Sequence, residues 1–149
     1  MEHEILTEDQ LLAMPECDYM YASQKQYFRK ILSEMHASLK NEIHQAREEM
    51  NAPTDVGDTL ALASNADMLQ LNLRTTERKT KLLHKIEAAI SRIDNGVYGY
   101  CIETKAPIGL ERLLARPTAT LSIDSKEQQE FHEKTEGMSS IGDMEEQEK

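Results

Sequence analysis

The chain has 149 residues and a net charge of −10, and 39% of its residues are apolar but only 5% are aromatic. This length suits one domain, or one long element with a small unit attached, and the low aromatic content is typical of a helical protein without a large core. The acidic balance argues against nonspecific nucleic-acid binding, because such binding depends on Lys and Arg that neutralise phosphates.

The negative charge is concentrated at the two ends. Residues 1–22 carry six acidic residues and no Lys or Arg, and residues 127–149 carry eight acidic residues against Lys134 and Lys149. When both ends are taken from the totals, residues 23–126 keep 13 acidic and 15 basic residues. The middle of the chain is therefore slightly basic.

Cysteine usage and hydropathy indicate a cytoplasmic protein. The only two cysteines, Cys17 and Cys101, lie far apart, and the N-terminus lacks the basic region of a signal peptide. A disulfide framework is therefore not expected. No apolar run approaches the length of a membrane span, so we expect no membrane association.

Residues 1–22 are predicted to be a flexible acidic segment that leads into a long helix. Thr7 to Gln10 has the form of a capping box, but Pro15 follows soon afterwards. A second capping box, Ser23 to Gln26, opens a helix of about 28 residues. Its apolar residues recur at spacings of three and four: Phe28, Leu32, Met35, Leu39, Ile43, Ala46 and Met50.

A turn and a second long helix follow. The turn, Ala52 to Asp58, contains Pro53 and Gly57, which are strong helix breakers. The second helix starts near Asp58 and ends where Gly96 supplies a C′ residue. Its stripe consists of Leu69, Leu73, Thr76, Thr80, Leu83, Ile86, Ile90 and Ile93. Because such helices are not stable alone, residues 23–95 are predicted to form an antiparallel coiled-coil hairpin with its tip at about residues 52–63.

One face of this second helix is basic. The spacings of four, three and four residues place four cations on the same side: Arg74, Arg78, Lys81 and Lys85. On pattern alone, a merely solvated face is the simpler interpretation.

After Gly96 the chain consists of short pieces. Turn residues separate brief apolar segments, which predicts a globular unit over residues 96–125, too small to stand alone. A third capping box, Ser125 to Gln128, starts a C-terminal helix over residues 126–137. Residues 138–149 are polar and acidic and are expected to be disordered.

The small unit has the spacing of a zinc site without its ligands. Four positions follow the pattern C-x₂-C…C-x₂-C but hold one cysteine and three hydroxyl residues: Cys101, Thr104, Ser122 and Ser125. A hydroxyl is not deprotonated as readily as a thiol, so these residues are not expected to hold structural Zn²⁺. We predict no metal and no stably bound cofactor. The predicted fold class is mainly α, with a long antiparallel hairpin, a zinc-ribbon-like unit lacking metal, and a C-terminal helix.

The sequence does not suggest an enzyme. The five histidines show no metal-binding spacing, and no His or Asp partner is identifiable for Cys101. A Gly-rich phosphate loop and a pair of catalytic carboxylates are also missing.

Several segments closely resemble the DksA/TraR family. In the small unit they are Gly99 to Cys101, Pro107 to Leu113, Ala115 to Ala119 and Leu121 to Ser125. Tyr19-Met20, Phe28 to Leu32 and the hairpin extend the resemblance over about residues 18–134. Members of that family bind bacterial RNA polymerase, insert a coiled-coil tip into its secondary channel, and act with the nucleotide ppGpp on transcription initiation. Some members lack the zinc cysteines, and this chain resembles that zinc-independent group.

The resemblance also implies functional residues and partners. The family positions that contact ppGpp correspond to Lys85, Arg116 and Lys126, which are basic, as phosphate binding requires. Arg74 and Arg78 correspond to positions that support polymerase contact, and Lys81 belongs to the same face. The implied protein is a monomeric bacterial transcription regulator of the stringent response that does not bind DNA directly.

The family's tip pattern, Asp-x-x-Asp-x-Ala, fits this chain in two registers. Counting back from Lys85 without gaps places it on Asp58, Ala61 and Ala63, with the second Asp replaced. The other register keeps both acids, Asp55 and Asp58, but shifts the helix by three residues. We favour the first because the apolar stripe then needs no insertion. A helix cap remains the simpler role for Asp55.

Two further interpretations remain open. The heptads could join separate chains, as in a coiled-coil adaptor or a structural protein without transcriptional activity. The chain could also be a family member that binds polymerase without regulating it.

Overall fold

The computed structural model describes residues 6–52 and 59–145. Its helices are α1 (Glu8–Leu12), the 3₁₀ turn η1 (Glu16–Asp18), α2 (Ala22–Asn51), α3 (Thr59–Asp94), α4 (Leu110–Ala115) and α5 (Ile123–Glu145). The chain divides into two compact units, Met1–Tyr98 and Gly99–Lys149. Within the described ranges, no helix combines the length and the apolar character that crossing a membrane requires. The predicted fold class, mainly α with a long hairpin, is confirmed.

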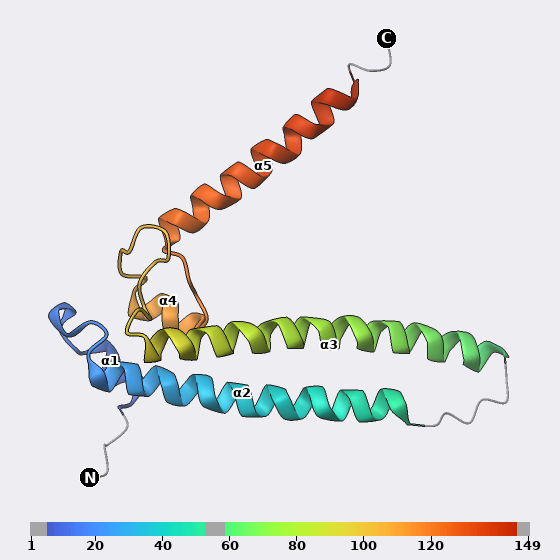
Figure 1. Ribbon diagram of the computed structural model, residues 1–149, viewed down its shortest axis with the longest axis horizontal. Coiled ribbons are helices and arrows are strands. Elements are labelled where there is room, and N and C mark those ends of the chain that lie inside the picture. The colour runs from blue at the N-terminus through green and yellow to red at the C-terminus, as the bar shows by residue number, and fades with distance from the viewer. Residues whose placement is uncertain (1–5, 53–58, 146–149) are drawn as a thin grey trace. The chain divides into compact units, whose positions relative to one another are not determined.

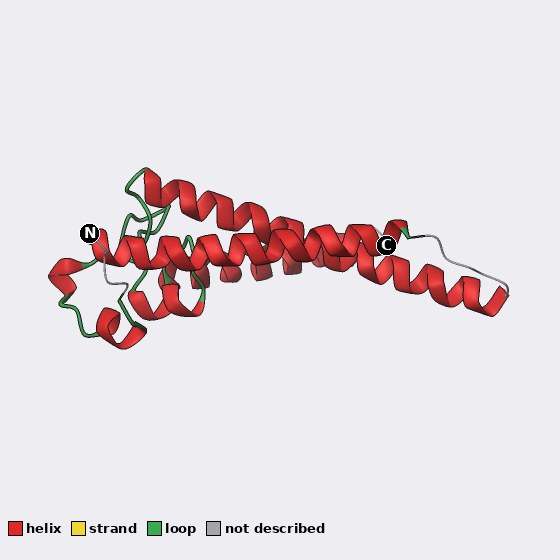
Figure 2. Cartoon of the chain, turned by 90° about the horizontal axis from the view of Figure 1, so that it is seen from below, coloured by secondary structure: helices red, strands yellow, loops and turns green. Residues whose placement is uncertain are grey.

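Helices α2 and α3 lie side by side and form the hairpin, as both views of the chain show (Figures 1 and 2). Their apolar stripes face each other near the base, where Phe28, Leu32, Ile86 and Ile93 are buried. The rings of Phe28 and Tyr98 close this core with centroids 5.6 Å apart. The predicted periodicity therefore identifies the helix–helix interface at the base.

Helix α3 ends as its sequence predicts. Gly96 has φ +75°, a left-handed conformation that glycine adopts at little cost. Its N–H donates to the carbonyl of Ile93 (3.1 Å), and that of Val97 donates to the carbonyl of Arg92 (3.0 Å). These two bonds form a Schellman motif that satisfies the last carbonyls of the helix.

The N-terminal segment contains more structure than the flexible acidic segment that was predicted for residues 1–22. Thr7 and Gln10 form the predicted capping box at the start of α1, and Leu11 is fully buried. Gln24, also buried, accepts a hydrogen bond from the N–H of Met20 (2.8 Å) and donates one to Sδ of Met14 (3.5 Å). These bonds join residues 14–20 to the start of α2.

The second unit consists of α4, α5 and the turns before them. An isolated β-bridge pairs Tyr100 with Pro107, and the side chains of Cys101, Ile108 and Leu113 are buried. Helix α5 begins at Ile123 and continues to Glu145, well beyond the predicted end at residue 137. A glycine inside a helix weakens it without necessarily ending it, so Gly137 is not a stop signal here.

Candidate partner-binding surfaces

The cations on the basic face of α3 are unpaired within the part of the chain that the structure describes. Arg74, Arg78, Lys81 and Lys85 are exposed and make no ion pair there. Other cations of the hairpin do pair: Lys79 reaches Glu42 across the interface at 3.1 Å, and Arg29 bonds Asp94. The basic face is therefore a concentration of positive charge open to an outside partner.

A carboxylate links the two helices closer to the base. Glu87 of α3 accepts a hydrogen bond from Nε2 of His36 on α2 (3.1 Å), and Nδ1 of His84 lies 3.4 Å from its other oxygen. Both hydrogen bonds lower the pKa of the Glu87 carboxyl group, and the bond from His36 has the larger effect. The contact between His36 and Glu87 joins two helices and has no local sequence signal, whereas the spacing of His84 and Glu87 on one helix is such a signal.

The distal part of α3 is solvent-exposed. Every residue from 59 to 75 is exposed, including the tip positions Ala61 and Ala63 and the large apolar residues Leu60 (78%) and Leu71 (63%). Asp55 and Asp58, the acidic tip candidates, lie outside the described residues. The register of the tip motif therefore stays a prediction.

The remaining predicted ppGpp residues belong to the second unit. Arg116 is exposed at the C-terminal end of α4, where its N–H donates to the carbonyl of Arg112 (2.8 Å). Lys126 lies in the first turn of α5, with its Nζ 3.8 Å from Glu130. Lys85 belongs to the first unit, so a joint site for the three residues stays a prediction.

The degenerate zinc positions form a hydrogen-bonded cluster in the second unit. Sγ of Cys101 lies 3.4 Å from Oγ of Ser125, which in turn lies 3.1 Å from Oγ of Ser122. Burial raises the pKa of the Cys101 thiol, but hydrogen bonds from Ser125, from Thr104 and from the backbone outweigh this and lower it to about 5. The cluster therefore favours a thiolate surrounded by donors.

Comparison with known proteins gives matches over most of the chain. Residues 24–93 match the family described as DnaK suppressor protein DksA, N-terminal domain, and residues 96–130 match the prokaryotic dksA/traR C4-type zinc finger. The RNA polymerase-binding transcription factor DksA of Caulobacter vibrioides is 38% identical over 117 residues, which are 78% of this chain and 82% of that protein. The protein of the same name from Escherichia coli K12 is 35% identical over 122 residues, 78% of each chain.

A solved structure agrees with the fold. The transcription factor DksA2 from Pseudomonas aeruginosa superimposes with a TM-score of 0.77 and 44% identity, over 86% of this chain and 99% of that one. The long hairpin and the second unit are the parts that this chain shares with a class of bacterial transcription factors. The chain belongs to the DksA family, as its sequence motifs predicted.

One expectation needs correction. The predicted absence of zinc and of any stably bound cofactor is contradicted by the match of residues 96–130 to a C4-type zinc finger, which points to zinc binding in this unit. The prediction considered only the ligand chemistry of four positions, whereas the match covers residues 96–130 as a whole. The donors that the structure brings together are one thiol and hydroxyl groups, which do not form a four-cysteine site. Among the described residues, no three His, Cys, Asp or Glu side chains are grouped to hold a metal.

Proposed function

We propose that this protein is a cytoplasmic RNA polymerase-binding regulator of transcription initiation that acts together with ppGpp. The hairpin enters the secondary channel of the polymerase, with Asp58, Ala61 and Ala63 at its tip. The protein acts as a monomer, makes no sequence-specific contact with DNA and catalyses no reaction.

The unpaired basic face carries this proposal. Arg74, Arg78 and Lys81 make no ion pair within the described residues, whereas the neighbouring Lys79 is paired with Glu42. Charges of this kind steer a protein towards an acidic partner and favour one orientation on it. The relatives that share this fold are named for binding RNA polymerase.

The ppGpp part of the proposal rests on three cations. Lys85, Arg116 and Lys126 would bind the phosphate groups at the polymerase interface, Arg116 as a planar fork and the lysines as point charges. The Lys126–Glu130 pair is half-exposed and spans 3.8 Å. Such surface pairs contribute little, so a phosphate can replace Glu130 at small cost.

Binding to core RNA polymerase and run-off transcription from a ribosomal promoter test the proposal together. Arg78→Ala should weaken polymerase binding, whereas the control Lys30→Ala, on α2, should not. Asp58→Asn should bind but lose regulation, and Lys126→Ala should lose only the response to ppGpp. Unchanged transcript yields in the presence of bound wild-type protein would contradict the regulatory function.

The exposed apolar residues of α3 favour one alternative, a coiled-coil adaptor that pairs with a second chain. Leu60 and Leu71 could then pack between chains. Sedimentation equilibrium separates the two functions. A measured mass equal to that of one chain would support the polymerase-binding function, and the mass of a stable dimer would support the adaptor function.

A further inference from the structure

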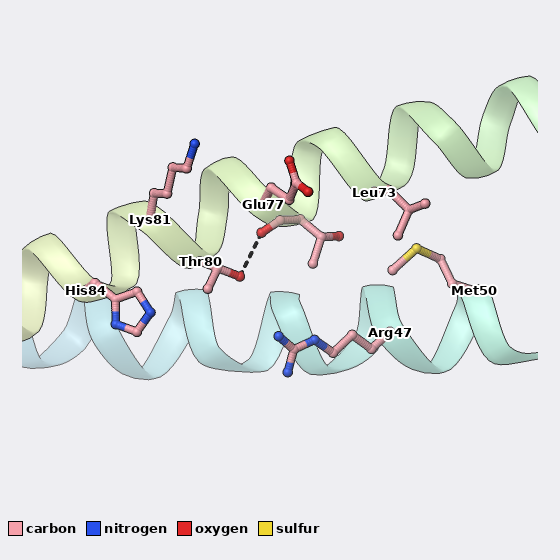
Figure 3. Close-up of a pocket in the computed structure, with 8 residues that line it drawn as sticks. Arg47, Met50, Leu73, Glu77, Thr80, Lys81 and His84 are labelled. Atoms are coloured by element: carbon pink, nitrogen blue, oxygen red, sulfur yellow. Dashed lines mark hydrogen bonds between the residues drawn. The ribbon is translucent and has the colours of Figure 1, made fainter.

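A groove of about 630 Å³ lies between α2 and α3 in the part of the hairpin beyond Ile86 (Figure 3). Its volume is within the range of pockets that hold small organic ligands. Arg47 and Met50 line it from α2, and residues between Leu73 and His84 line it from α3. None of the residues proposed to contact ppGpp belongs to it.

The two ends of the groove differ in chemistry. Met50 and Leu73 face each other at one end, and Arg47 extends along α2 towards the side on which His84 lies (Figure 3). Arg47 has no ion pair among the residues that the structure describes. The side chains of Glu77 and Lys81 leave α3 on the side away from α2 (Figure 3). The groove therefore has a cationic end and an apolar end.

A buried hydroxyl in the groove lacks a hydrogen-bond partner. Thr75 and Thr80 each donate to the carbonyl four residues earlier, at 3.0 and 2.9 Å, as helical threonines commonly do. Thr76 lines the groove with a side chain only 6% exposed, but its Oγ1 has no partner. Buried polar groups are seldom left unsatisfied, so this hydroxyl indicates a missing acceptor.

We infer that the groove binds a small amphipathic anion, a phosphate ester with an apolar or aromatic body. Its phosphate oxygens would accept hydrogen bonds from the Arg47 guanidinium and the Thr76 hydroxyl. Its body would lie between Met50 and Leu73 and bury apolar surface there.

Two probes separate these contributions in the full-length protein: pyrophosphate, which offers only the anion, and ADP, which adds a sugar and an aromatic base. Titrations followed by ¹⁵N-HSQC spectra should show saturable shifts of the Thr76, Thr80 and His84 amides with both probes. ADP should bind about 10-fold more tightly, because the base buries apolar surface.

Substitutions test the cationic end and the apolar end of the groove separately. Arg47→Ala should lower the affinity for both probes at least about 10-fold, because this is the usual effect of losing a charged hydrogen bond. Leu73→Ala should lower the affinity for ADP alone. Lys40 is an exposed α2 cation outside the groove, so Lys40→Ala should change neither affinity. Circular dichroism checks that each variant keeps its helices.

Several results would overturn the inference. Equal affinity of the Arg47→Ala and wild-type proteins, or shifts centred on Arg74 and Arg78, would place the anion elsewhere. Equal affinity for ADP and pyrophosphate would exclude the apolar end from binding. Because no polymerase is present, these outcomes are independent of the proposed regulatory function.

Discussion

The base and the distal part of the hairpin use the same two helices differently. Near the base, Phe28, Leu32 and Ile86 are fully buried, and ion pairs join α2 to α3. In the distal part, every residue of α3 from 59 to 75 is exposed, although Leu69 and Leu73 continue the apolar stripe. An apolar stripe thus gives burial only where the facing helix supplies side chains to pack against.

This difference separates stability from binding. Apolar surface removed from water at the base supplies most of the stabilising free energy of the first unit. Apolar residues left exposed near the tip contribute little to folding and remain available to a partner. Substitutions in the two regions should therefore have different consequences, and the following predictions begin with the largest effect.

Truncating the aromatic core of the base should have the largest effect on stability. Phe28→Ala is expected to lower the free energy of unfolding by about 3–5 kcal/mol, because it leaves a cavity beside Tyr98. The distal substitution Leu71→Ala should change it by less than about 0.5 kcal/mol. Urea denaturation followed by circular dichroism measures both, and similar losses would refute the comparison.

Gln24→Ala should have the second largest effect. It leaves the N–H of Met20 without its acceptor, and an unsatisfied buried donor costs about 1–3 kcal/mol. The control Gln26→Ala, at an exposed site of the same helix, should be close to neutral. Urea denaturation gives the energies, and limited proteolysis should show faster cleavage between residues 13 and 19 in Gln24→Ala only.

Removing the exposed ion pair at the base should have a smaller effect. Arg29 and Asp94 are about half-exposed, so Arg29→Ala should cost about 0.2–1 kcal/mol. The loss should shrink in 1 M salt, because surface charges are screened. A loss that does not change with salt would mean that the packing of the Arg29 stem matters more than its charge.

The smallest effect is expected for Glu87→Gln, and it should depend on pH. A carboxyl group with a lowered pKa stabilises the fold above its unfolded value of about 4.5, and this contribution is lost as the pH falls through the folded value. The wild type should therefore melt slightly above the variant at pH 6, and the difference should vanish in strong acid. Thermal melts at several pH values test this, and a difference that persists at pH 2 would contradict it.

The features that were predictable are those with local causes. The spacing of Phe28 and Leu32 identified the buried side of α2, and Gly96 marked the end of α3, because helical periodicity and left-handed φ are local properties. The burial of Gln24 depends on contacts with Met14 and Met20, which periodicity does not report.

The candidate sites were predictable to a lesser extent. The stripe from Arg74 to Lys85 was visible in the sequence, but its lack of acidic partners was not, because pairing such as that of Lys79 with Glu42 depends on the register of the opposite helix. The groove between Arg47 and His84 was missed for the same reason. The zinc prediction was wrong: it considered four ligand positions, whereas residues 96–130 as a whole match a C4-type zinc finger.

The apolar stripe and the basic face of α3 lie on one continuous helix, and this restricts how the protein can change in length. One residue inserted between Arg74 and Ile86 would rotate part of the basic face by about 100° relative to the buried stripe. Seven residues added to each helix would keep both faces aligned to within about 20° and lengthen the hairpin by about 10 Å. The reach of the hairpin can therefore change in whole heptads, but not residue by residue.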